Sequence, residues 1–159
     1  MVKLYMKYFT GIEALNYHGA DWHSVYFDYT KVYPDEIRTW CGDYGIVRKE
    51  DREIANPVRA FLDYILYLIK YKNIVPTKRI QDLNFSDDEE NDIKEAIERY
   101  LEPYLRKNEE DYELFLKWKK YNDGGIYEYT TKSFARKEAW IKMLEKIRAN
   151  ERDNKNTVR

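Results

Sequence analysis

Stretches with helical periodicity fill the chain from Asn56 onward. Asn56 and Pro57 combine an N-cap residue with a proline at the first helical position, which marks the start of a helix. Apolar residues then recur at helical spacing from Val58 to Ile69, so this helix is expected to lie at the centre of the core. Three more helices are predicted on the same grounds, beginning near residues 87, 109 and 133.

Capping and breaking residues mark the limits of these later helices. Ser86 and Glu89 form a capping-box pattern, and Pro103 is expected to kink or end the helix that follows them. The next helix ends at the NDGG segment, residues 122–125. The last helix is expected to bury an apolar face made of Phe134, Trp140, Ile141, Leu144 and Ile147.

The N-terminal third predicts shorter elements. Residues 2–9 and 22–30 are rich in aromatic and β-branched side chains, and they predict two strands that pair with each other. Thr10 and Glu13 fit a capping box, which predicts a short helix directly after Thr10. Another short helix is expected over 34–40, because proline is tolerated in the first helical turn.

Together these elements indicate an α+β fold that is mostly α: a helical bundle of about four main helices packed against a small N-terminal β-element. A chain of 159 residues, 43% of them hydrophobic, closes one core, so a single globular domain is expected over 1–150. Residues 151–159 have almost nothing apolar to bury and are expected to form a disordered polar tail.

Charge and cysteine content limit the classes of partner. The 28 basic and 29 acidic side chains nearly cancel, so no global field draws the chain to nucleic acid or to an anionic membrane. Cys41 is the single cysteine, and the first residues lack the apolar core of a signal peptide, which predicts a cytoplasmic protein. The most apolar run, 60–69, contains Asp63 and is too short to span a membrane.

Chemically capable side chains crowd into the first 46 residues. Four of them are of types that bind zinc: His18, Asp21, His23 and Cys41. Their spacing matches no recognised zinc pattern, so no metal site and no cofactor are predicted. A nucleophilic pairing of Cys41 with a histidine lacks a third group and an oxyanion hole in the sequence. A small metal-assisted hydrolase or nuclease that uses Asp21, His23 and Asp43 stays open as an alternative.

Aromatic content leaves two interpretations open. Aromatic residues make up 16% of the chain, and 16 of them are tyrosines. Such a composition suits a protein interface or base stacking, and it also arises from the codon bias of an AT-rich genome. Lysines surround Trp118 as nucleic-acid contacts would require, but acidic residues precede them on the same helix. A solvated amphipathic helix is therefore favoured there, and nucleic acid is not the favoured partner.

Four short motifs in the first 69 residues follow one another in a particular order: 8–16 (YFTGIEALN), 21–23 (DWH), 42–46 (GDYGI) and 56–63 (NPVRAFLD). In the order of these motifs, residues 6–69 resemble a group of small bacterial proteins often encoded beside abortive-infection nucleotidyltransferase toxins. The resemblance implies an antitoxin-like or phage-defence role and assigns no catalysis. It singles out Gly11, Glu13, Asp21, Trp22, His23, Asp43, Gly45, Arg59 and Asp63. The helical part from Asn73 onward departs from the pattern.

The preferred functional hypothesis is a protein-binding module that acts on a partner protein, with a toxin encoded nearby as the expected partner. Its predicted partner-binding residues are Asp21, Trp22, His23, Trp40, Asp43, Tyr44, Arg59 and Asp63. Within this set, Arg59 and Asp63 stand four residues apart on one helix face and are expected to hold the surface in place. Two interpretations of them remain: a local ion pair at the surface, or a buried clamp on the preceding loop.

Overall fold

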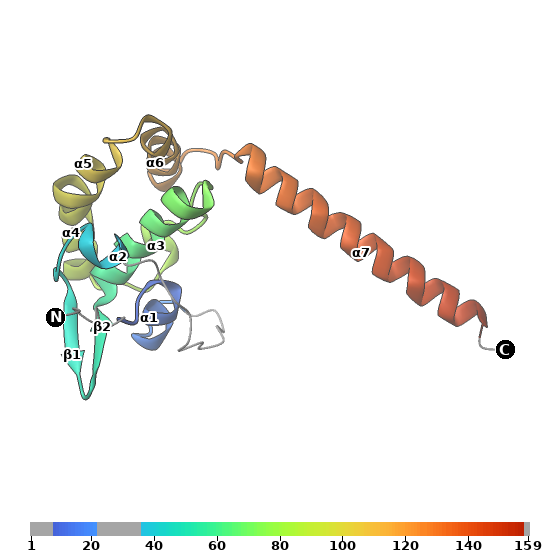
Figure 1. Cartoon of the computed structure of the whole chain (residues 1–159), viewed down its shortest axis with the longest axis horizontal. Helices are drawn as coiled ribbons and strands as arrows, with labels where there is room; N and C mark the ends of the chain where they lie inside the picture. The colour runs from blue at the N-terminus through green and yellow to red at the C-terminus, as the bar shows by residue number, and fades with distance from the viewer. Residues whose placement is uncertain (1–7, 22–35, 158–159) are drawn as a thin grey trace, which may run out of the picture. The chain divides into compact units, whose positions relative to one another are not determined.

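The computed structural model describes residues 8–21 and 36–157 and divides the chain into two units, Met1–Glu128 and Tyr129–Arg159 (Figure 1). The division falls inside the range 1–150 that the sequence assigned to one domain. The strand predicted over 22–30, together with Trp22 and His23, lies outside the described residues, as does most of the strand predicted over 2–9. Each unit is described by itself.

Helix α3 (Pro57–Lys72) forms the centre of the first unit, as its apolar pattern predicted (Figure 1). The Asn56 side chain accepts a hydrogen bond from the Arg59 backbone N–H at 2.8 Å, which confirms the predicted N-cap. Asn73 ends the helix in a left-handed conformation. Every residue from Val58 to Leu66 is buried, because α1, β2, α4 and α6 all pack against this helix.

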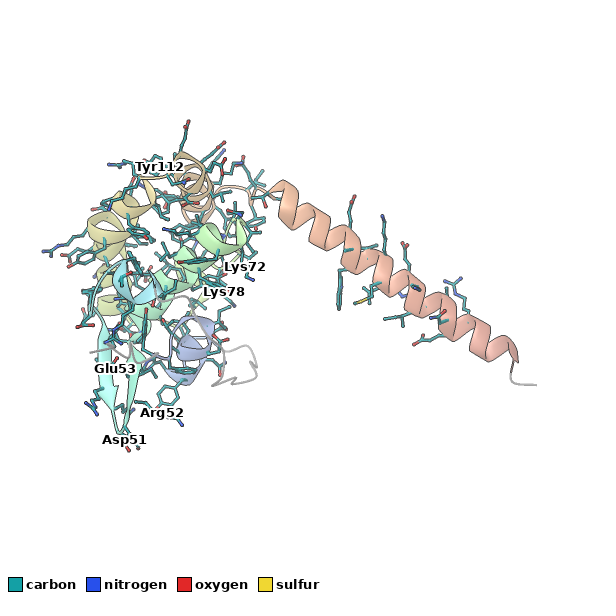
Figure 2. The ribbon with its side chains drawn as sticks, in the orientation of Figure 1. Asp51, Arg52, Glu53, Lys72, Lys78 and Tyr112 are labelled. Atoms are coloured by element: carbon teal, nitrogen blue, oxygen red, sulfur yellow. The ribbon has the colours of Figure 1, made fainter. Side chains whose placement is uncertain are left out.

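The sheet of the first unit is a hairpin of β1 (Ile46–Lys49) and β2 (Arg52–Ala55), with Ile46 paired to Ala55. Asp51 and Arg52 lie exposed at its tip (Figure 2). No strand was predicted here, because only the last two residues of the hairpin are buried and the alternating signal is short. From the predicted first strand, Phe9 joins the hairpin as a single parallel bridge to Ile54.

Short helices precede the hairpin. Helix α1 (Gly11–Tyr17) begins where it was predicted, but the capping box at Thr10 is wrong: its hydroxyl makes no cap and donates to Asp63 instead. Helix α2 (Glu36–Thr39) lies within the short helix expected over 34–40. The N-terminal third thus contains two short helices, as the sequence predicted. Its described sheet is formed by residues 46–49 and 52–55, which the sequence did not predict as strands.

A nearly continuous helical run follows a short 3-10 turn (Ile80–Asp82). It consists of α4 (Asp87–Ala96), a π-helix (Ile97–Leu101) and α5 (Glu102–Leu105), and its predicted capping box between Ser86 and Glu89 is confirmed. The π-helix, in which the Glu102 N–H donates to the Ile97 carbonyl, stands directly before Pro103. Proline lacks an N–H, and the wider turn carries the run past it without a break.

Helix α6 (Glu109–Asn122) closes the core of the first unit. Phe115 and Trp118 are buried, and the Trp118 indole N–H donates to the Lys78 carbonyl at 3.0 Å. Phe61 of α3 contacts the Trp118 ring at a centroid distance of 6.0 Å. A mostly helical α+β fold with a small two-stranded sheet on its N-terminal side is thus confirmed.

The second unit consists of helix α7 (Thr131–Thr157). Of the apolar residues that the sequence expected to be buried, Trp140 is 57% exposed, and Ile141 and Ile147 are each 45% exposed in this unit. The helix also continues to Thr157, through the segment expected to be a disordered tail from residue 151. Glu, Arg and Lys are good helix formers, and adding residues to an existing helix costs little. Within the described ranges, none of the helices combines the length and apolar character that a membrane span needs.

Gly45 offers a test of how closely the start of the hairpin packs against α3. It has φ of +71°, and a Cβ added there would stand 2.6 Å from the Arg59 Cβ. We expect Gly45→Ala to lower the free energy of unfolding by about 3 kcal/mol, from the left-handed backbone and the clash together. Gly42→Ala is the matched control, because Gly42 has φ of +60° with nothing within 4 Å, and it should cost about 1 kcal/mol. Equal losses in urea denaturation would contradict the close packing at Gly45.

Candidate functional site

An ion pair between Arg59 and Asp63 lies at the centre of the first unit. Both residues stand on α3, four positions apart, and the Arg59 Nε is 2.9 Å from the Asp63 Oδ1. Their side chains are 0% and 1% exposed. This geometry decides between the two interpretations of the pair: it is the buried clamp and not a surface ion pair.

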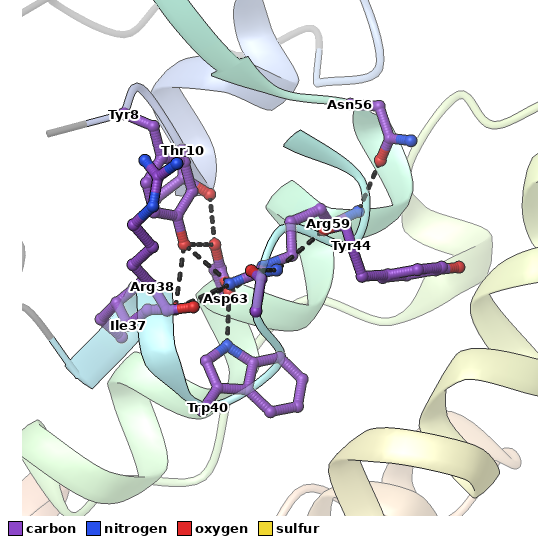
Figure 3. Close-up of polar contacts among 10 residues, drawn as sticks. Tyr8, Thr10, Ile37, Arg38, Trp40, Tyr44, Asn56, Arg59 and Asp63 are labelled. Carbon is purple, nitrogen blue, oxygen red and sulfur yellow. Dashed lines mark hydrogen bonds and ion pairs between the residues drawn. The ribbon is translucent and has the colours of Figure 1, made fainter. Parts of the chain in front are cut away.

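Asp63 accepts hydrogen bonds from four side chains (Figure 3). Its Oδ2 accepts from the Tyr8 hydroxyl at 2.5 Å and from the Thr10 hydroxyl at 2.7 Å. Its Oδ1 accepts from the Trp40 indole at 2.8 Å and from Arg59. Because each carboxylate oxygen has two donors, the ionised carboxylate is satisfied without water.

Arg59 connects the same network to backbone carbonyls by hydrogen bonds. Its Nη1 donates to the carbonyls of Gly42 and Tyr44, each at 2.8 Å, and its Nη2 donates to the carbonyl of Ile37 at 2.8 Å. The planar guanidinium is suited to this role because its donors diverge in fixed directions. The segment from the end of α2 to Gly45 has little regular structure. Its backbone carbonyls are therefore bound by one side chain, Arg59 of α3.

Burial shifts the titration of the groups in this network. Burial raises the pKa of Asp63, while the charge of Arg59 and the hydrogen bonds from Tyr8, Trp40 and Thr10 act in the opposite direction. Burial, then the nearby charge of Asp63, raises the pKa of Tyr8. Tyr8 thus keeps its proton and remains the donor to Asp63.

Four half-buried aromatic side chains lie in two pairs beside the clamp; the aromatic cluster is Trp40, Tyr44, Tyr100 and Tyr104. The ring centroids of Trp40 and Tyr104 are 5.7 Å apart, and those of Tyr44 and Tyr100 are 4.9 Å apart. The Arg59 guanidinium lies 5.4 Å from the Trp40 ring centroid. Each pair joins one residue of the loop after α2 to the helical run, at Tyr100 in the π-helix and at Tyr104 in α5.

Of the predicted site residues, the structure brings together Trp40, Tyr44, Arg59 and Asp63, while the exposed Asp43 side chain pairs with Arg38. Sequence reasoning missed Tyr100 and Tyr104, the two partners of this loop. The signal that could have found them is their spacing of four residues on the helical run around Pro103, which places both on one face.

Asp21 lies in a different environment from Asp43. The buried Asp21 carboxylate is 2.9 Å from the Lys78 Nζ (Lys78 is labelled in Figure 2). The Asp43 side chain is 81% exposed and is 3.2 Å from Arg38. The two carboxylates share no charged partner in these ion pairs, and no group of metal-ligating side chains gathers among the residues that the structure describes. The hydrolase alternative therefore gains no support from Asp21 and Asp43, and its third residue, His23, lies outside the described residues.

No family model, curated protein or solved structure matches the chain. The likeness of residues 6–69 to proteins encoded beside nucleotidyltransferase toxins stays an expectation from short sequence motifs.

The clamp predicts a large difference between two aspartate substitutions. Asp63→Ala leaves the buried Arg59 guanidinium without its carboxylate, and we expect the free energy of unfolding to fall by about 3 to 5 kcal/mol. Asp43→Asn removes only an exposed ion pair and should change it by less than about 0.5 kcal/mol. Urea denaturation followed by circular dichroism measures both, and a comparable small loss for the two variants would show that the pair is not a clamp.

Cys41 gives a second test of this environment. The thiol is half-buried beside the clamp, and burial raises its pKa. We expect iodoacetamide to alkylate Cys41 in the folded protein at pH 8 several-fold more slowly than in the same protein unfolded in urea, as followed by mass spectrometry. Alkylation of the folded protein as fast as that of the unfolded protein would instead favour a nucleophilic role for Cys41.

Proposed function

We propose that this chain is a cytoplasmic protein-binding module whose first unit contacts a partner protein through the aromatic cluster and Asp43. The observation that carries the proposal is the aromatic cluster itself, in which two pairs of half-buried rings join two distant segments beside a satisfied buried network. Tyrosine, tryptophan and arginine dominate the centres of protein interfaces, since they bring contact area at low entropic cost.

Preorganisation supports the same proposal. The loop that carries Trp40 and Tyr44 is hydrogen-bonded through its backbone to Arg59, so little conformational entropy remains to be lost on binding. In this proposal Trp40, Asp43 and Tyr44 touch the partner. Arg59 and Asp63 are buried and act as positioning residues, and so does Asp21 through Lys78.

The resemblance of residues 6–69 supports one kind of partner. It favours an antitoxin-like or phage-defence role, in which the partner is a toxin encoded by a neighbouring gene. Trp22 and His23 stay predicted contacts of this partner.

Coexpression of the chain with the product of the neighbouring gene tests the proposal. We expect the two to copurify, and we expect Tyr100→Ala to weaken the complex by about 2 kcal/mol, which is about 30-fold in the dissociation constant. The reason is that Tyr100 is half-buried and packs on Tyr44, whose backbone carbonyl is bound by the clamp.

Tyr17→Ala is the matched control, because Tyr17 is a 47% exposed tyrosine on α1 outside the aromatic cluster. Its complex should keep the affinity of the unsubstituted chain, as measured by isothermal titration calorimetry. An unchanged affinity for Tyr100→Ala, with both variants folded, would place the interface elsewhere. Failure of the two products to copurify would remove the toxin as partner.

A further inference from the structure

The Asp63 carboxylate takes its hydrogen bonds from two segments that are far apart in sequence. Its Oδ2 accepts from Tyr8 and Thr10, which belong to the segment before α1. Its Oδ1 accepts from Trp40, in the loop after α2, and from Arg59. Figure 3 shows Tyr8 and Thr10 on one side of Asp63 and the Trp40 indole on another. The two segments therefore meet at one carboxylate, and each binds a different oxygen of it.

Burial makes these two sets of hydrogen bonds depend on each other. The Asp63 side chain is 1% exposed, so water does not replace a donor that leaves. Both donors of Oδ2 leave together when the segment before α1 is released, because Tyr8 and Thr10 are two residues apart. The bare oxygen is stabilised again once water reaches it, which requires the packing around the clamp to open.

The Arg59 guanidinium is a second link between the same segments. Its Nη2 is 3.1 Å from the Tyr8 hydroxyl and 2.8 Å from the Ile37 carbonyl. Its Nη1 binds the carbonyls of Gly42 and Tyr44 in the loop after α2. A planar guanidinium moves as one body, so a shift at Nη2 also changes the hydrogen bonds of Nη1. Release of Tyr8 thus reaches the loop through this side chain.

We propose that residues 8–10 are a strap that controls the loop after α2: docking of the strap holds the loop in place, and release of the strap opens it. A coupling free energy between two sites acts equally in both directions. Release of the strap therefore loosens Trp40 and Tyr44, and a molecule that binds these two residues tightens the strap. That this molecule is a protein rests on the proposed function, whereas the coupling is a property of the chain alone.

The bond between the strap and the sheet is short enough for local release. Phe9 donates to the Glu53 carbonyl at 3.0 Å and accepts from the Ala55 N–H at 2.8 Å, and together these form an isolated parallel bridge. Segments with few backbone hydrogen bonds open locally while the core around them stays folded. The strap is therefore released without loss of the hairpin or of α3.

Hydrogen exchange of single N–H groups in the full chain, followed by NMR, tests the coupling. The Trp40 indole N–H reports on the loop after α2, and the Ala55 backbone N–H, bonded to Phe9, reports on the strap. The Trp118 indole N–H, bonded to the Lys78 carbonyl, is the reference in the core. We expect Trp40 and Ala55 to open with one common equilibrium constant, larger than that of Trp118, because strap and loop open together before the core unfolds.

Tyr8→Phe removes the strap hydroxyl and should raise both opening constants about 10-fold or more, since the closed state loses a hydrogen bond to a charged group. Thr10→Val removes the other donor of Oδ2 and should give the same pattern, which keeps the test decisive if Tyr8→Phe does not fold. Tyr127→Phe is the matched control, because the Tyr127 hydroxyl donates to the Val75 carbonyl outside the clamp. It should leave both constants unchanged.

Trp40→Phe tests the reverse direction. It removes the indole donor of Oδ1 and should raise the opening constant at Ala55, whereas a strap that is independent of the loop would not respond.

Three results would overturn the proposal. They are a Trp40 indole that does not respond to Tyr8→Phe, an Ala55 N–H that does not respond to Trp40→Phe, and exchange of both groups with the opening constant of Trp118, which means that they open only with the whole core. None of these measurements uses a partner, so the coupling and the proposed function fail or stand separately.

Discussion

The ion pair between Arg59 and Asp63 is the interaction on which the rest of the first unit depends. A buried charge is tolerated only when a partner and hydrogen bonds replace its water. Asp63 meets that requirement by collecting donors from three segments that are far apart in sequence, and Arg59 meets it by donating to backbone carbonyls. The same requirement that makes the pair costly to bury therefore fixes the positions of residues 8–10 and 37–45.

Those contacts also shape how the chain folds. The bonds from Tyr8 and Thr10 to Asp63 span 55 and 53 residues of sequence. Such long-range contacts form after local helices, because the entropy of closing the intervening loop must be offset first. Helix α3 is capped by a residue next to it, whereas the N-terminal segment and the loop after α2 contact this helix only through long-range bonds.

The sequence predicted what depends on local patterns. The caps at Asn56 and Ser86 and the buried face of α3 are encoded in adjacent residues, and all are found in the structure. What the sequence could not show depends on tertiary partners. Thr10 matched a cap but bonds to Asp63, and a hairpin with two buried residues has too weak a pattern to identify. Arg59 and Asp63 were recognised as a pair, but the four residues of the aromatic cluster meet only through the fold.

Helix α7 differs from these cases, because the sequence identified its apolar pattern but could not show what covers it. The periodic apolar residues from Trp140 to Ile147 predict a buried face whether the covering surface belongs to the same chain or to another. Sequence periodicity therefore predicts that an apolar face is buried, but it does not identify the molecule that buries it.

The π-helix at Ile97–Leu101 gives the aromatic cluster its register. Such a turn holds about one residue more than an α-turn, so everything after it is rotated by about 100° around the helix axis. The core residues Ile93 and Ala96 precede the insertion, while Tyr104 follows it and reaches Trp40. Loss of a single residue here would preserve the helix yet turn Tyr104 away from the loop, so the aromatic cluster depends on the rotational phase of the helix as much as on residue type.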